Sequence, residues 1–173
     1  MNLEKELLKG HNRALATKIA KWAIQDKAHM AELMEVFFKN VELLTQRAAW
    51  SVNIAFELDP EIIKPYLKKM VLNLKKPVHD AVKRNTVRIL GFIETPKAIE
   101  GETVDICFNL MADPKEAIAV RAFAMTVVFN LLPKYPELKN EFKVIVEDQL
   151  PFATAAFKSR GNKYLMRLEK EKV

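Results

Sequence analysis

Apolar residues recur along most of the chain at the three- and four-residue spacing of one helix face. The clearest stretch lies between residues 62 and 74, with Ile62, Ile63, Tyr66, Leu67, Met70, Val71 and Leu74. Apolar positions at i, i+3 and i+4 are typical of an amphipathic helix that covers a core with one face. Because the strand-like alternation of apolar and polar residues is hard to find, the pattern predicts an all-α protein.

Aspartate-proline pairs mark the boundaries of several helices. At Asp59-Pro60 and at Asp113-Pro114 a capping side chain precedes a proline, which is favoured at the first position of a helix. With these and similar boundaries the sequence predicts nine helices, at residues 11–25, 29–39, 41–58, 60–76, 78–94, 101–112, 115–133, 136–149 and 152–170. After the first, we expect them to pair as antiparallel helix hairpins.

An arginine recurs in the second helix of each predicted pair. Arg47, Arg84 and Arg121 are spaced by 37 and 37 residues, and Arg160 follows after 39. Apolar residues flank the first three in a similar way. A fixed period of this length is typical of helical-repeat proteins, in which stacked pairs bury the apolar face that one pair alone leaves exposed.

One predicted pair carries the most specific pattern. Residues 101–132 contain a first helix, the turn Asp113-Pro114, then Arg121 and Ala124 within an apolar run. This segment resembles a repeat of the HEAT/armadillo superfamily. The 34-residue period and the signature of tetratricopeptide repeats are not seen.

The resemblance implies a right-handed α-α superhelix, a HEAT/armadillo-like solenoid of about four helix pairs with a capping N-terminal helix. We expect a single domain over residues 1–173, with a polar N-terminal segment at 1–10 and a C-terminal tail at 171–173. Such a stack presents a concave surface lined by the second helix of each pair.

The recurring arginines Arg47, Arg84, Arg121 and Arg160 have two possible roles. In the resembling families this arginine usually ties one repeat to the next through an acid or a backbone carbonyl. Alternatively, some of the four face the concave surface and bind carboxylate or phosphate, for which the guanidinium fork is suited.

Basic residues are concentrated in two segments of a chain whose net charge is +6. Residues 64–88 contain eight Lys and Arg side chains and one Asp, and residues 155–173 contain six basic and two acidic side chains. A solvated polar face explains such a cluster. A patch for an anionic partner is the other explanation, and its candidates are Lys64, Lys68, Lys69, Lys83 and Arg88.

The residues that usually carry metal or cofactor chemistry are sparse. Cys107 is the single cysteine and lies in an apolar helix, and His11, His29 and His79 lack metal-ligand spacing. The four glycines form no phosphate-binding loop. We therefore expect no metal and no cofactor.

Neither a leader peptide nor a transmembrane helix is expected. The N-terminus has no apolar core of signal-peptide length, and no uncharged apolar stretch reaches about 18 residues. A single cysteine fits a reducing, cytoplasmic location.

These observations favour a non-enzymatic interaction scaffold that holds a protein partner on its concave surface. The alternative is a nucleic-acid-binding protein, since some HEAT-like proteins of similar period and basicity are alkylpurine DNA glycosylases. The aromatic and acidic residues available for such a cleft are Trp22, Trp50, Asp59, Tyr66 and Asp80. None of them matches a motif of that family. We expect both tryptophans in the core.

An enzyme acting on a small molecule is the third hypothesis. The signature loop of fumarase-type lyases is absent from the sequence. The GxSxG motif, which carries the nucleophilic serine of many hydrolases, is absent as well. No residue is singled out as catalytic.

Overall fold

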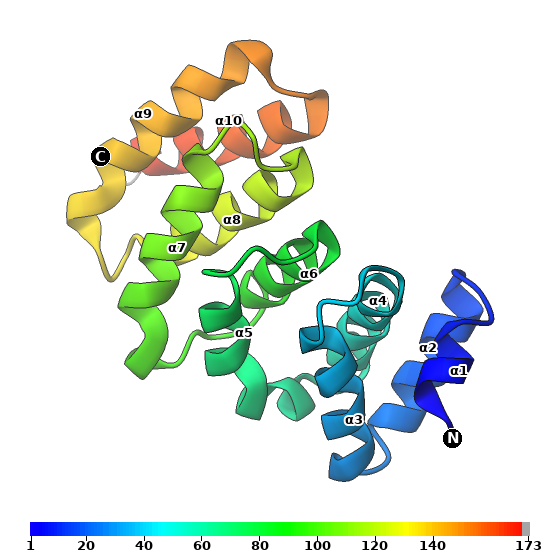
Figure 1. Cartoon of the computed structure of the whole chain (residues 1–173). Coiled ribbons are helices and arrows are strands. Elements are labelled where there is room, and N and C mark those ends of the chain that lie inside the picture. Colours follow the sequence, from blue (N-terminus) through cyan, green and yellow to red (C-terminus); the bar gives the residue numbers. More distant parts are fainter. Residues whose placement is uncertain (171–173) are drawn as a thin grey trace. The chain divides into compact units, whose positions relative to one another are not determined.

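The computed structural model describes residues 1–170, and the tail predicted at 171–173 lies outside them. The described residues form helices and no strand (Figure 1), which confirms the predicted all-α fold class. The α-helices are α1 (Leu3–Leu7), α2 (Arg13–Ala23), α3 (Lys27–Phe38), α4 (Glu42–Leu58), α5 (Leu67–Asn73), α6 (Asp80–Leu90), α7 (Glu100–Ala112), α8 (Ile118–Leu131), α9 (Lys139–Gln149) and α10 (Ala155–Lys170). The 3-10 helices are η1 (Pro60–Tyr66), η2 (Lys97–Ile99), η3 (Pro136–Leu138) and η4 (Leu150–Phe152).

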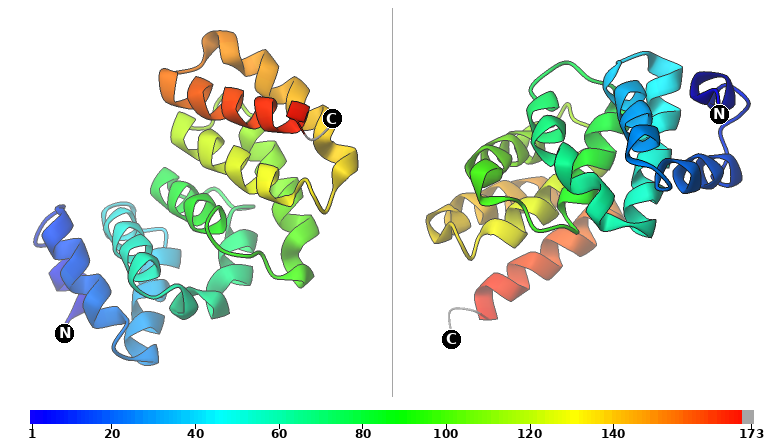
Figure 2. Two further views of the ribbon diagram at one scale, coloured as in Figure 1. Left: turned by 180° about the vertical axis from the view of Figure 1, so that it is seen from behind. Right: turned by 90° about the horizontal axis from the view of Figure 1, so that it is seen from below.

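The chain forms two compact units, Met1–Ile89 and Leu90–Val173. In the N-terminal unit α4 packs against α2 and α3, and η1 packs against α4 and α5. In the C-terminal unit α7 packs against α8, and α10 packs against α8 and α9. Figure 2 shows α8 and α10 side by side in its left view.

Each unit has its own apolar core. Phe37 of α3 and Met70 of α5 are fully buried in the N-terminal unit, as are Phe142 of α9 and Ala124 of α8 in the C-terminal unit. Helix α8 is apolar on almost every side, as the sequence shows, because it packs against both α7 and α10.

The N-terminal segment predicted as polar contains a short packed helix. Asn2 caps α1 by accepting a hydrogen bond from the Lys5 backbone N–H at 3.1 Å. Leu3 and Leu7 are buried. The helix was missed because five residues are too few to show a helical period.

Three other predictions differ from the structure. The helix predicted at 60–76 is η1 followed by α5, because Pro65 has no backbone N–H to continue an α-helix. The helix predicted at 78–94 ends earlier, as α6 at Leu90. The tryptophans are half-buried rather than core residues: the ring of Trp22 stacks on His29, and that of Trp50 lies 5.0 Å from His11.

Polar side chains join neighbouring repeats at a distance of one period along the chain. The Arg160 guanidinium donates to the carbonyl of Ala122, and the hydroxyl of Tyr164 donates to that of Thr126, each across 38 residues. The amide of Asn130 donates to the Gly91 carbonyl across 39 residues. These bonds are the structural counterpart of the repeat seen in the sequence, and we call them inter-repeat tethers.

Asn40 provides a tether of this kind in the N-terminal unit. It lies between α3 and α4 with a φ of 56°, a left-handed conformation that asparagine tolerates. Its side-chain amide donates to the Pro77 carbonyl and accepts from the His79 backbone N–H, both at 3.3 Å. The ring of His79 in turn accepts from the Ala81 backbone N–H at 3.0 Å and caps α6.

Candidate functional site

The recurring arginines Arg47 and Arg121 make hydrogen bonds inside their own units. Arg47 donates to the Leu7 carbonyl at 2.6 Å and so joins α4 to the end of α1. Arg121 donates to the side-chain oxygen of Gln149 at 2.5 Å. The amide nitrogen of Gln149 donates to the Met111 carbonyl at 2.9 Å, so that one side chain of α9 links α8 to α7.

The other two recurring arginines have different surroundings. The Arg160 guanidinium donates to the Ala122 carbonyl at 2.7 Å and lies 4.9 Å from the centre of the Phe123 ring. Arg84, on α6, is exposed. The same position of the repeat therefore holds three half-buried arginines that donate hydrogen bonds and one exposed arginine, Arg84.

Two of the five candidates for an anion-binding patch line a common hollow. Lys64 pairs with Glu61 at 2.6 Å, and Arg88 pairs with Glu57 at 2.8 Å. Lys68 and Lys69 line a hollow in the N-terminal unit whose lining includes none of Lys64, Lys83 and Arg88. Lys83 and Arg88 lie on α6, whereas Lys68 and Lys69 lie on α5.

Lys76 completes that hollow, although it was not among the candidates. It follows Lys68 by eight residues and Leu72 by four, so the three share one side of α5 and its continuation. The neighbouring Asn73 is buried, and its amide nitrogen has no acceptor among residues 1–170.

A second hollow lies between the two second helices of the C-terminal unit, α8 and α10. Its volume is about 410 Å³, and we call it the α8/α10 groove. The side chains that line it and matter most are Phe92, Phe123, Thr126, Arg160, Lys163 and Tyr164. On α10 the last three follow the i, i+3, i+4 spacing that places side chains on one helix face.

The walls of the α8/α10 groove are held by the inter-repeat tethers. Tyr164 is bonded to Thr126 at 3.0 Å, which joins α10 to α8 at one end. Asn130 is bonded to the Gly91 carbonyl at 3.0 Å and anchors the turn that carries Phe92. The Phe92 side chain is nevertheless 71% exposed. Arg160 and Lys163 are the charged lining residues, and no carboxylate lies among them.

Most residues of this groove were not found by sequence reasoning. Arg160 was a candidate because of its register, but Phe92 lies in an apolar run that we predicted as helix. Lys163 and Tyr164 carry a weak signal, their helical spacing from Arg160. The sequence could not show that α8 and α10 lie side by side at this point.

The single cysteine is buried in α7, and this controls its protonation. Burial raises the pKa of the Cys107 thiol to about 12, so the thiolate needed for nucleophilic attack is not formed near neutral pH. Within residues 1–170, no group of three or more His, Cys, Asp and Glu side chains could hold a metal ion. None of the helices there is both long and apolar enough to cross a bilayer.

Helix pairs joined by polar bonds at a fixed period define an α-helical repeat protein. The family model of the HEAT repeat domain matches residues 3–165, and the chain belongs to this family. No curated protein and no solved structure matches the chain.

Proposed function

We propose that this chain is a non-catalytic interaction protein that holds an acidic segment of a protein partner in the α8/α10 groove. HEAT repeats commonly mediate protein interactions. Repeat proteins use the surfaces of successive stacked units for binding. The groove lies on the second helices of two neighbouring repeats, and one of the recurring arginines, Arg160, lines it.

The observation that carries the proposal is an exposed aromatic side chain beside two cations. A phenylalanine that is 71% exposed leaves apolar surface in water, and aromatic and arginine side chains dominate the binding energy of many interfaces. The Arg160 guanidinium has five N–H donors, and the Ala122 carbonyl accepts from one nitrogen only. Its other donors, together with Lys163, suit a carboxylate beside an apolar side chain.

A single-stranded nucleic acid is the second candidate ligand for the same groove. Bases stack on aromatic side chains, and lysine and arginine neutralise the phosphates. Phe92 and Phe123 next to Arg160 and Lys163 provide both elements. The steepness of the salt dependence separates the candidates, because a nucleic acid also releases counterions from its phosphate backbone and should lose more affinity with salt than an acidic peptide.

The test is binding of two labelled probes at low and moderate ionic strength. The first is a set of acidic peptides that each contain one leucine or aromatic residue, and the second is a mixed-sequence DNA single strand. Phe92→Ala and Lys163→Glu should each weaken peptide binding about tenfold. Arg160 is left intact because its loss also removes a tether.

Phe152→Ala is the matched control, since Phe152 is 92% exposed in the same unit and does not line the groove. It should bind peptides like the wild type. Peptide binding that neither groove variant weakens would refute the α8/α10 groove as the site. Binding of the DNA alone, with a steep salt dependence, would replace the protein partner by a nucleic acid.

A further inference from the structure

Two hollows of opposite charge lie next to each other on the N-terminal unit. The acidic hollow, of about 760 Å³, is lined by Glu4, Glu32 and Glu35, and Lys39 also lines it. The basic hollow, of about 640 Å³, is lined by Lys68 and Lys76 with the apolar Phe38, Pro65 and Leu72. Phe38 and Lys69 line both, so the hollows share a wall.

The charges in the two hollows are only partly neutralised within the unit. Glu4 pairs with Lys39 at 2.7 Å. Glu32 and Glu35 are exposed and make no ion pair with another residue of the described chain, and the same holds for Lys68 and Lys76. Two acidic and two basic side chains therefore remain available to a partner.

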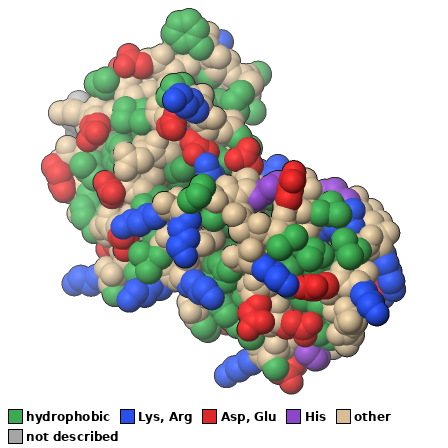
Figure 3. Space-filling view, viewed as in Figure 1, with side chains coloured by type: hydrophobic (Ala, Val, Ile, Leu, Met, Phe, Trp, Pro, Cys, Tyr) green, Lys and Arg blue, Asp and Glu red, His purple; other side chains and the backbone are tan. Residues whose placement is uncertain are grey.

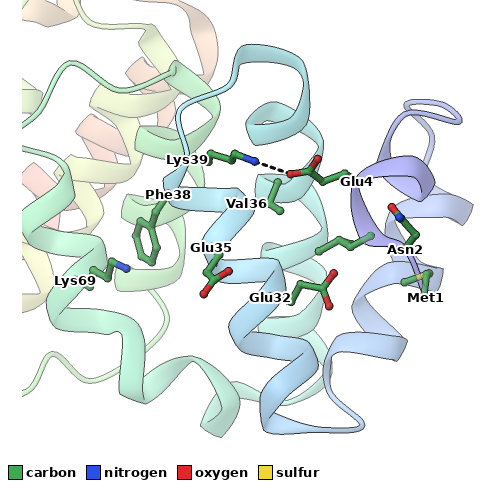
Figure 4. A pocket seen from close by; sticks show the side chains of 10 residues that line it. Met1, Asn2, Glu4, Glu32, Glu35, Val36, Phe38, Lys39 and Lys69 are labelled. Carbon is green, nitrogen blue, oxygen red and sulfur yellow. Dashed lines mark hydrogen bonds and ion pairs between the residues drawn. The ribbon is translucent and has the colours of Figure 1, made fainter.

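The arrangement of the shared wall places the two signs on one face. The Lys69 ammonium lies 4.4 Å from the centre of the Phe38 ring. Figure 4 shows Phe38 between Lys69 of α5 and the glutamates of α3. In Figure 3 acidic side chains gather over α3, and basic side chains gather beside them over α5.

We propose that this face binds a second copy of the chain. A two-fold axis near Phe38 and Lys69 places the acidic hollow of each copy opposite the basic hollow of the other. A two-fold interface is self-complementary, since residue i meets residue j and residue j meets residue i. A partner for this face needs both signs of charge side by side, and a second copy has them by its own construction.

The proposed dimer combines charge pairing with an apolar centre. Glu32 and Glu35 of one copy meet Lys68 and Lys76 of the other on both sides of the axis. Phe38 of each copy lies at the centre, where apolar contact excludes water. Because the charges are exposed before association, the dimer should weaken with ionic strength. It uses a different unit from the α8/α10 groove, so it does not depend on the function proposed above.

The experiment is a charge exchange measured by sedimentation equilibrium of the full chain over a range of concentrations at low salt. Glu32→Lys/Glu35→Lys makes both hollows basic, and Lys68→Glu/Lys76→Glu makes both acidic. Each variant alone should dimerise at least about tenfold more weakly than the wild type. Mixing the two variants should restore a dimer that contains one copy of each.

Control variants carry the same changes of net charge outside the hollows. Glu42→Lys/Glu137→Lys and Lys21→Glu/Lys115→Glu use residues that are exposed and line neither hollow. Each should dimerise within about twofold of the wild type, and circular dichroism checks that every variant is folded. A wild type that stays monomeric at all concentrations at low salt would overturn the proposal. So would a mixture of the two hollow variants that dimerises no better than each hollow variant alone.

Discussion

The two units of the molecule differ in charge while they share a way of joining repeats. Residues 1–89 carry 16 basic and 10 acidic side chains, and residues 90–173 carry 12 of each, so the net charge of +6 belongs to the N-terminal unit. In both units, however, a polar side chain reaches a backbone carbonyl about one period away. Examples are Arg47 to Leu7 and Arg160 to Ala122.

The comparison separates what maintains the repeat from what varies on its surface. Arg47 and Arg160 are half-buried, and their guanidinium groups donate to the backbone carbonyls of Leu7 and Ala122, where a lost bond is costly. The exposed charges make few such bonds, and single surface substitutions usually change stability little. We therefore expect the tethers to contribute more to stability than the exposed charges do.

The largest effect is expected from a charge in the core of the C-terminal unit. Ala124 is fully buried in α8, and Ala124→Glu places a carboxylate there without a partner. We expect a loss of more than about 4 kcal/mol of stability and unfolding of this unit. Urea unfolding followed by circular dichroism measures it. Tryptophan emission reports on the N-terminal unit alone, because Trp22 and Trp50 both lie there.

Ala119→Glu is the control on the same helix, since Ala119 is exposed. It should change stability by less than about 0.5 kcal/mol. If Ala124→Glu unfolds at the wild-type urea concentration, the assignment of α8 to the core is wrong. We also expect the tryptophan transition to shift less than the helical signal in Ala124→Glu.

Arginines at one repeat position should contribute differently to stability where their surroundings differ. Arg121→Gln removes the hydrogen bond to Gln149 and the contact of the guanidinium with the Phe157 ring, 5.5 Å away. We expect a loss of about 2 kcal/mol, because a charged hydrogen bond in a half-buried site is removed. Arg84→Gln, on the exposed arginine of α6, should cost less than about 0.5 kcal/mol. Equal losses of stability in urea unfolding would mean that the position of an arginine in the repeat decides its contribution to stability, and that the groups around it do not.

A smaller effect is expected where α10 approaches α9. A Cβ atom on Gly161 would lie 3.0 Å from a methyl carbon of Val146 and 3.1 Å from one of Leu150. Gly161→Ala should therefore destabilise the C-terminal unit by about 1 kcal/mol or more, despite the better helix propensity of alanine. Gly101→Ala in the first turn of α7 meets no atom within 4 Å and should stabilise by up to about 1 kcal/mol. Thermal unfolding of the two variants should move in opposite directions.

Local signals in the sequence predicted the helices well where a single side chain decides the outcome. Asp59 accepts a hydrogen bond from the Glu61 backbone N–H at 3.1 Å and begins η1, as its position before a proline predicts. Asp113 makes a similar bond to the Lys115 N–H at 2.8 Å, although α8 begins only at Ile118. That a helix follows each boundary was predictable, whereas its first residue and its 3-10 or α form were not.

The candidate sites were less predictable because they join side chains from different helices. The acidic and basic hollows meet at Phe38, which follows α3 residues of one sign and faces α5 residues of the other. Periodicity places Lys68 and Lys76 on one face of a helix. It cannot show whether a neighbouring helix covers that face or leaves it exposed. Phe92 was not found because the predicted helix continued through Gly91, although a glycine directly after the last helical residue is a common signal of a helix end.

The smallest effects concern one ion-pair cluster in each unit, and they have opposite pH dependence. In the N-terminal unit, hydrogen bonds from Lys18 at 2.5 Å and from Lys9 at 2.6 Å lower the pKa of Glu6 below its ordinary value of 4.5. In the C-terminal unit, the hydrogen bond with Glu100 raises the pKa of Lys134 above its ordinary value of 10.5. Each shift means that the folded state stabilises the charged form of the side chain.

The sign of each contribution follows from linkage. The contribution of Glu6 to the free energy of unfolding is fully present above pH 4.5 and is lost as the pH falls through the lowered pKa. Glu6→Gln should therefore be less stable than the wild type at neutral pH and equally stable in acid. The contribution of Lys134 to the free energy of unfolding is present below pH 10.5 and is lost as the pH rises through the raised pKa. The stability of Lys134→Met should therefore approach that of the wild type in alkali. Urea unfolding of each variant and the wild type across pH measures both differences. A stability difference that stays constant with pH would mean that the ion pair does not couple protonation to folding in that unit.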